Sequence, residues 1–160
     1  MAIRLRRFIP ITTIIAATGF FIVLLGLCTG CAGSDGFVKA DLGQEVSLRI
    51  GQTAQIENEQ LSIRFNGISG DSRCPRGVQC FWAGEVKCDV TVTYQGASSN
   101  ITLTQPGIRE PYPETYKGYL FIISVQPYPE AGKQISTAEY RLKMTVEKLP
   151  PGLDSYSLSP

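Results

Sequence analysis

The stretch at residues 71–84, DSRCPRGVQCFWAG, decides how we expect the domain to fold. Cys74 and Cys80 flank a Pro-Arg-Gly turn, and Trp82, the only tryptophan, follows shortly after the second cysteine. A disulfide between these two cysteines would close a small ring and stabilise the fold by about 2 kcal/mol on the loop-entropy estimate. We therefore expect a covalent loop that fixes the insertion of Trp82, as a large anchor, into the core.

The cysteines and the tryptophan leave alternatives open. Cys88 lies in phase with the valines of a predicted strand, which favours a small buried side chain over a reactive thiol. A Cys80–Cys88 disulfide competes with the Cys74–Cys80 pairing. Metal binding by the three thiolates is a third option, although no histidine is present to complete such a site. Outside the core, Trp82 would instead offer a stacking surface to a sugar or a protein partner.

Apolar residues recur at every second position over most of residues 45–148, which is the pattern of strands with one buried face. The segment 119–126 is apolar on both faces at its start and indicates a central or covered strand. About seven short strands separated by turns predict an all-β fold, an antiparallel, immunoglobulin-like β-sandwich. The expected strands are 46–50, 54–56, 61–65, 85–93, 101–103, 119–126 and 139–147.

The composition limits both the size of the fold and its chemistry. A chain of 160 residues that is 43% hydrophobic is long enough for one domain with its own core. Histidine is absent, which removes the usual general base of hydrolases and the commonest metal ligand. Without three arginines near the N-terminus, 12 of the 15 basic residues remain against 14 acidic ones, a net charge of −2, so nothing indicates nucleic-acid binding. We expect no catalytic residue, no metal and no cofactor.

The first 30 residues have the organisation of an export signal. Three arginines precede an uncharged apolar run at 8–27, and Thr29-Gly30 then precede Cys31. This region resembles a bacterial lipoprotein signal peptide, which implies cleavage before Cys31, acylation of that cysteine and a domain tethered to a membrane outside the cytoplasm. Cleavage before Cys28, an uncleaved membrane helix and simple secretion are the alternatives. We expect a signal peptide at 1–30, a flexible tether at 31–44, the β-sandwich at 45–148 and a loose tail at 149–160.

The proline-rich stretch at 105–119 is the candidate binding surface. Its tyrosines and charged residues suit the amphipathic, low-entropy contacts that binding loops make. Alternatively, the prolines stiffen a crossover and the tyrosines cap the sheet. The candidate contact residues are Arg109, Tyr112, Tyr116 and Tyr119, and their partner would be a protein or a carbohydrate.

Three parts of the domain also carry a family resemblance. They are GQTAQIENEQLSIRFNGI at 51–68, DSRCPRGVQCFWAG at 71–84, and GYLFIISVQPYP at 118–129 followed by YRLKMTVEK at 140–148. Together they resemble a family of small bacterial envelope proteins, often lipoproteins, with the signature SRCPxxVxCxWAG. The resemblance supports the domain boundary and the Cys74–Cys80 disulfide, and it implies no activity. Phe81 and Glu85 depart from the smaller or neutral residues that are usual in the family.

We expect a membrane-anchored, extracytoplasmic lipoprotein of the bacterial cell envelope whose β-sandwich binds or scaffolds a partner without catalysis. A structural subunit of envelope assembly is the alternative, and it would expose a contiguous apolar patch. A carboxylate-based hydrolase is a weaker alternative because it requires several carboxylates to converge in one pocket. Those carboxylates would be Asp71, Glu85, Glu110 and Glu114.

Overall fold

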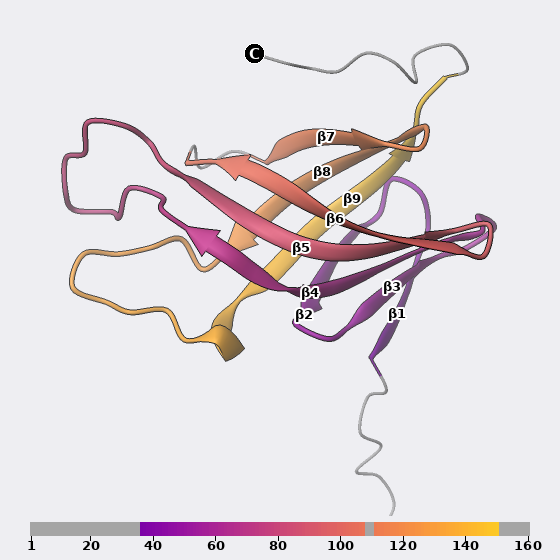
Figure 1. Cartoon of the computed structure of the whole chain (residues 1–160), viewed down its shortest axis with the longest axis horizontal. Coiled ribbons are helices and arrows are strands. Elements are labelled where there is room, and N and C mark those ends of the chain that lie inside the picture. Colours follow the sequence, from indigo (N-terminus) through magenta and orange to yellow (C-terminus); the bar gives the residue numbers. More distant parts are fainter. Residues whose placement is uncertain (1–35, 108–110, 151–160) are drawn as a thin grey trace, which may run out of the picture. The chain divides into compact units, whose positions relative to one another are not determined.

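The computed structural model describes residues 36–107 and 111–150, which form two packed β-sheets (Figure 1). The five-stranded sheet has the order β1-β3-β4-β5-β6, and the four-stranded sheet has the order β2-β9-β8-β7. Neighbouring strands are antiparallel, except for the parallel pair β1 and β3. The elements are β1 (Phe37–Ala40), β2 (Glu45–Arg49), β3 (Thr53–Ile56), β4 (Leu61–Asp71), β5 (Glu85–Tyr94), β6 (Ala97–Pro106), β7 (Tyr112–Tyr116), β8 (Tyr119–Gln126), the 3-10 helix η1 (Thr137–Glu139) and β9 (Arg141–Lys148).

The hydrophobic core lies between the two sheets because alternate side chains of each strand point inward. On β5 the side chains at 86, 88, 90 and 92 are fully buried, while those between them are exposed or half-buried. β8 is buried over most of its length, as expected for a strand with neighbours on both sides. The buried hydrophobic residues are Ala40, Val46, Leu48, Ala54, Ile56, Leu61, Ile63, Phe65, Val86, Cys88, Val90, Val92, Leu103, Tyr119, Phe121, Ile123, Val125, Leu142, Met144 and Val146.

The expected all-β sandwich is confirmed, but the strand order differs from the immunoglobulin arrangement that we expected. Strands β3 to β6 are consecutive both along the chain and across one sheet. In an immunoglobulin domain the chain leaves the first sheet after its second strand and returns to it later. Short turns between β3 and β4 and between β5 and β6 instead favour hairpins within one sheet.

Two strands lie where none was expected. β1 falls inside the predicted tether, so residues 37–40 are part of the sandwich, paired with β3. β7 falls inside the predicted proline-rich loop. An edge strand tolerates Pro113 because its outer side needs no hydrogen-bond donor. Cys31, the predicted signal at 1–30 and most of the predicted tail lie outside the described residues.

The described ranges 36–107 and 111–150 include no helix of the length and hydropathy required to cross a membrane.

Candidate binding site

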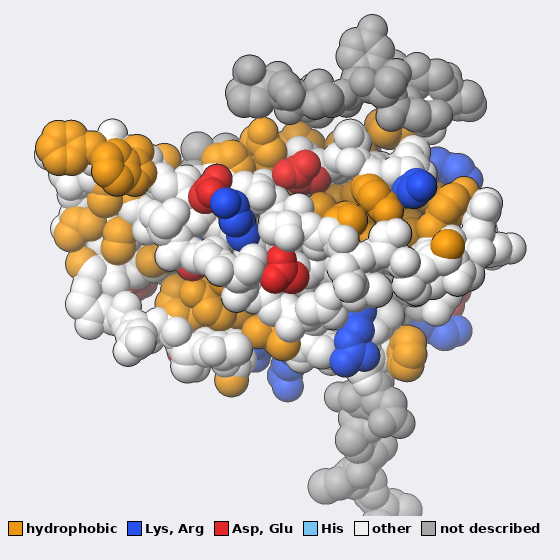
Figure 2. Space-filling model, in the orientation of Figure 1, with side chains coloured by type: hydrophobic (Ala, Val, Ile, Leu, Met, Phe, Trp, Pro, Cys, Tyr) orange, Lys and Arg blue, Asp and Glu red, His pale blue; other side chains and the backbone are white. Residues whose placement is uncertain are grey.

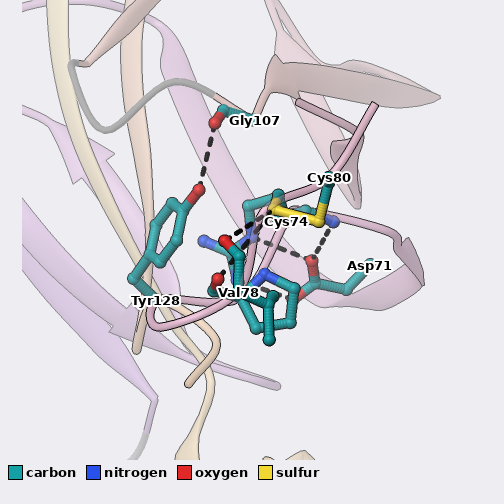
Figure 3. The surroundings of a disulfide bond; sticks show 8 residues. Asp71, Cys74, Val78, Cys80, Gly107 and Tyr128 are labelled. Carbon is teal, nitrogen blue, oxygen red and sulfur yellow. Dashed lines mark hydrogen bonds and ion pairs between the residues drawn. A yellow bond between two sulfur atoms is a disulfide. The ribbon is translucent and has the colours of Figure 1, made fainter. Parts of the chain in front are cut away.

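The connection between β4 and β5, residues 72–84, forms a covalently closed loop at one end of the sandwich, here named the aromatic loop (Figure 1). Cys74 and Cys80 form the expected disulfide, with Cα atoms 6.0 Å apart (Figure 3). Cys88 is a free, buried thiol on β5, so the Cys80–Cys88 alternative is wrong. Burial raises the pKa of the Cys88 thiol to about 12, which makes it an unreactive core side chain.

Trp82 lies outside the core, so the prediction that it anchors the core is wrong. It is 75% exposed, and the neighbouring Phe81 is fully exposed. The disulfide turns the chain back at Cys80, which is itself exposed, and β5 begins only at Glu85. The residues between them therefore lie beyond the end of the sheet. Figure 2 shows hydrophobic side chains gathered at the end of the molecule where the aromatic loop lies.

The side chain that the aromatic loop buries in the interior is that of Arg73, not that of Trp82. Arg73 is only 3% exposed. Its Nε and Nη2 donate to the two carboxylate oxygens of Asp71 at 2.8 and 2.6 Å. Nη1 donates to the carbonyl of Val125 at 2.7 Å, and Nη2 donates to that of Pro127 at 3.1 Å. Because a buried charge is tolerated only when it is paired and hydrogen-bonded, this network attaches the loop firmly to the end of β8.

The Asp71 carboxylate is held in its charged form. Burial raises the pKa of Asp71, but the hydrogen bonds and the charge of Arg73 outweigh burial, so the pKa lies below its usual range. The hydroxyl of Tyr140 also donates to Asp71, at 3.1 Å. Burial and the Asp71 charge raise the pKa of Tyr140 to about 12. Asp71 thus acts as a structural anion in this network.

Backbone pairing attaches the aromatic loop to a second connection, residues 127–140 between β8 and β9. The N–H of Arg76 donates to the carbonyl of Pro129 at 2.9 Å, and the N–H of Ala131 donates to the carbonyl of Arg76 at 3.0 Å. Within the loop, the N–H of Cys74 donates to the carbonyl of Ala83 at 2.8 Å. These bonds leave the loop few conformations to lose when it binds a partner.

The ring of Tyr128 contacts both arginines of the aromatic loop. The guanidinium carbons of Arg73 and Arg76 lie 5.2 and 5.3 Å from the centre of its ring, within the range of cation–π attraction. Its hydroxyl donates to the carbonyl of Gly107 at 3.0 Å (Figure 3). Arg76 remains exposed at the surface.

Two glycines allow the loop to close against the end of β6. Gly84 has a φ of 72°, and a Cβ there would collide with the backbone carbonyl of Ser72. A Cβ at Gly107 would collide with the backbone of Ala83. The N–H of Gly107 donates to the carbonyl of Gly84 at 2.7 Å. This close approach of the backbones requires glycine at position 84, directly after Trp82 and Ala83.

An open hollow of about 620 Å³ lies along the aromatic loop. Among the described side chains that line it, only Arg76, Trp82 and Tyr128 carry hydrogen-bonding nitrogen or oxygen atoms, and none of these is a carboxylate or an amide. The described part of the hollow therefore offers aromatic and apolar contact together with the exposed cation of Arg76. Its lining residues are Cys74, Pro75, Arg76, Gly77, Val78, Cys80, Phe81, Trp82, Ala83, Gly107 and Tyr128.

The tyrosines that we expected to form the binding surface lie away from this hollow. Tyr112 and Tyr116 are half-buried on the edge strand β7, and neither lines the hollow. Tyr119 is 2% exposed, and its hydroxyl donates to Glu59 at 2.7 Å, so its prediction as a contact residue is wrong. Arg109 lies outside the described residues.

Of the four carboxylates considered for catalysis, the three that the structure describes each have a separate partner. Asp71 binds Arg73, and Glu85 forms an ion pair with Lys87 at 2.8 Å. Glu114 accepts a hydrogen bond from the backbone N–H of Thr104 at 3.3 Å. None of the three lines the hollow. Glu110 is outside the described part of the chain, and within that part no three metal-ligating side chains cluster.

The fold and the site define a two-sheet, all-β domain that presents a rigid, disulfide-closed aromatic loop. No family model matches this chain, and no curated protein or solved structure is significantly similar to it.

Proposed function

We propose that this chain is a non-catalytic binding module, held to a membrane of the bacterial cell envelope by a lipid on Cys31, and that the aromatic loop is its contact surface. The observation that carries the proposal is the exposure of Phe81 and Trp82 on a firmly attached loop. Tryptophan, tyrosine and arginine dominate the binding energy of protein interfaces. A restrained loop also binds with a small entropy loss.

The partner that best fits this surface is a protein with apolar side chains beside a carboxylate. Arg76 is exposed and lies against Tyr128, and a planar guanidinium at the surface suits bidentate binding of a carboxylate. A carbohydrate ligand fits less well, because the described lining of the hollow includes no carboxylate or amide side chain to orient sugar hydroxyls.

Site-specific photo-cross-linking in intact cells tests this proposal. A photoreactive amino acid at position 81 should give a discrete covalent adduct with an envelope protein. The same group at position 37 is the matched control, because Phe37 is also an exposed apolar residue, 69% exposed on β1. Adding Trp82→Ala to the position-81 variant should lower the adduct yield at least about tenfold, because it removes an aromatic anchor.

Equal adducts from positions 81 and 37, or none from position 81, would contradict the aromatic loop as the contact surface. An adduct that glycosidases remove and proteases leave intact would replace the protein partner by a carbohydrate.

The lipid anchor is tested independently. A Cys31→Ser variant should lose palmitate labelling and partitioning into detergent, and a Cys28→Ser variant should retain both. Unchanged labelling of the Cys31 variant would rule out lipidation at that residue.

We also propose that the chain is a member of the envelope family whose signature it resembles. Four signature residues build the aromatic loop: Arg73 anchors it, Cys74 and Cys80 close it, and Gly84 lets the backbones meet. Exchanging residues 71–84 for the same segment of a family member should preserve the thermal midpoint of unfolding. A large drop in that midpoint would contradict a shared loop structure.

A further inference from the structure

We propose that the free edge of β6, at residues 97–102, pairs antiparallel with the same segment of a second copy of this chain. β6 is the last strand of the five-stranded sheet. Residues 97–100 and 102 are exposed, and residue 101 is half-buried. Within the described residues, no hydrogen bond from outside β5 reaches the backbone of this segment. Among the described strands, the segment is therefore a sheet edge with no partner on its outer side.

The hydrogen bonds of β6 show which of its backbone groups face outward. The N–H of Thr104 donates to the side chain of Glu114, away from β5. Backbone groups alternate along a strand, so Ser98, Asn100 and Thr102 also direct their N–H and C=O groups outward. Their side chains hydrogen-bond to opposite β5 residues at 2.8, 2.7 and 2.8 Å, consistent with non-hydrogen-bonded pairs in the β5–β6 ladder.

The residues of the free segment with outward backbone groups, Ser98, Asn100 and Thr102, are spaced evenly about Asn100. The turn at Gln95 and Gly96 ends the segment on one side, and the hydrogen bond that the N–H of Thr104 donates to Glu114 ends it on the other. A two-fold axis at Asn100 brings the two Asn100 residues opposite each other and sets Ser98 opposite Thr102 of the second copy. Every outward N–H and C=O of these three residues then has a partner in the second copy.

The segment lacks the features that normally keep a sheet edge unpaired. Residues 97–102 are Ala-Ser-Ser-Asn-Ile-Thr, with no charge and no proline. Edge strands usually carry lysine, proline or a bulge to prevent pairing. The edge strand β7 of the other sheet contains Pro113 and Glu114. Because residues 97–102 carry no charge, two copies meet there without like charges opposed.

A second hollow lies at the same edge. It has a volume of about 290 Å³, and its described lining residues are Val92, Tyr94, Gln95, Ala97, Ser99, Tyr116 and Lys117. In the proposed pairing, Ile101 of the second copy lies opposite Ser99. An apolar side chain is thereby placed at the hollow that Tyr94 and Tyr116 help to line, which favours a second copy over an unrelated polar strand.

Sedimentation equilibrium of the purified full chain in detergent tests the pairing. The wild type should show a concentration-dependent species of twice the mass of one chain. Asn100→Pro removes an outward N–H without breaking the β5–β6 ladder, and Asn100→Lys places two like charges opposite each other. Each variant should weaken dimerisation at least about tenfold.

Ser62→Lys, on the central strand β4 of the same sheet, is the matched control and should dimerise as the wild type does. Circular dichroism should show that all variants are folded. A wild type that is monomeric at every concentration, or an Asn100→Pro variant that dimerises normally, would overturn the proposal. Trp82→Ala should leave dimerisation unchanged, so failure of the aromatic loop as a binding surface can be distinguished from failure of this pairing.

Discussion

Trp82 and Phe121 are both large aromatic residues, but only Phe121 is completely buried; Trp82 is 75% exposed. Trp82→Ala should change the free energy of unfolding by less than about 0.5 kcal/mol, because it removes little buried contact. Phe121→Ala should lower that free energy by about 3–5 kcal/mol, because it empties a core position. Urea denaturation of the two variants measures both values. A loss for Trp82→Ala as large as that for Phe121→Ala would show that Trp82 belongs to the core.

The Asp71–Arg73 ion pair should make stability depend on pH. Burial raises the pKa of Asp71, but the hydrogen bonds and charge of Arg73 outweigh burial and bring the pKa below its usual value. Since the folded pKa lies below the unfolded one of about 3.9, the stabilisation is fully present at neutral pH. It is lost as the pH falls below about 4 and through the folded pKa.

Asp71→Asn should therefore lower the free energy of unfolding by on the order of 3 kcal/mol at neutral pH, because it leaves Arg73 buried without its counter-ion. The difference from the wild type should shrink as the pH falls below about 4. Urea denaturation over a pH series measures it. A difference that stays constant in acid would contradict the ionised state assigned to Asp71.

The disulfide is one of several attachments of the aromatic loop, so its removal should weaken the domain without unfolding it. Replacing both Cys74 and Cys80 by alanine should lower the free energy of unfolding by about 2 kcal/mol. A reductant should destabilise the wild type by a similar amount and leave the double variant unaffected. Complete unfolding of the double variant would mean that the Arg73 network cannot hold the loop.

The strands could be predicted where alternation extends over several residues, as on β5 and β9. Alternation carries no information about β1, which is short and lies at an edge, or about β7, in which proline suggests a loop. The position of Trp82 was not predictable from periodicity, because residues 72–84 have none. The burial of Arg73 could not be predicted either, because its acceptors at residues 125 and 127 are distant in sequence.

The two proposed surfaces lie at opposite ends of β5. The aromatic loop precedes the first residue of that strand, and the free edge of β6 begins at the turn that follows its last residue. A strand of ten residues spans roughly 33 Å. In the proposed dimer the two copies run antiparallel, so their aromatic loops lie at opposite ends and both stay accessible. Partner binding and self-pairing should therefore be independent.

Trp82 is exposed in the free protein, and we predict that a partner covers it. Because Trp82 is the only tryptophan, labelling the full chain with 5-fluorotryptophan gives a single fluorine NMR signal while unlabelled partners stay invisible. We predict a clear solvent isotope shift in the free protein. Addition of unlabelled envelope extract should shift or broaden the signal, and Arg76→Ala should reduce that change. A signal without an isotope shift, or one that the extract leaves unchanged, would contradict the assignment of the aromatic loop as the binding site.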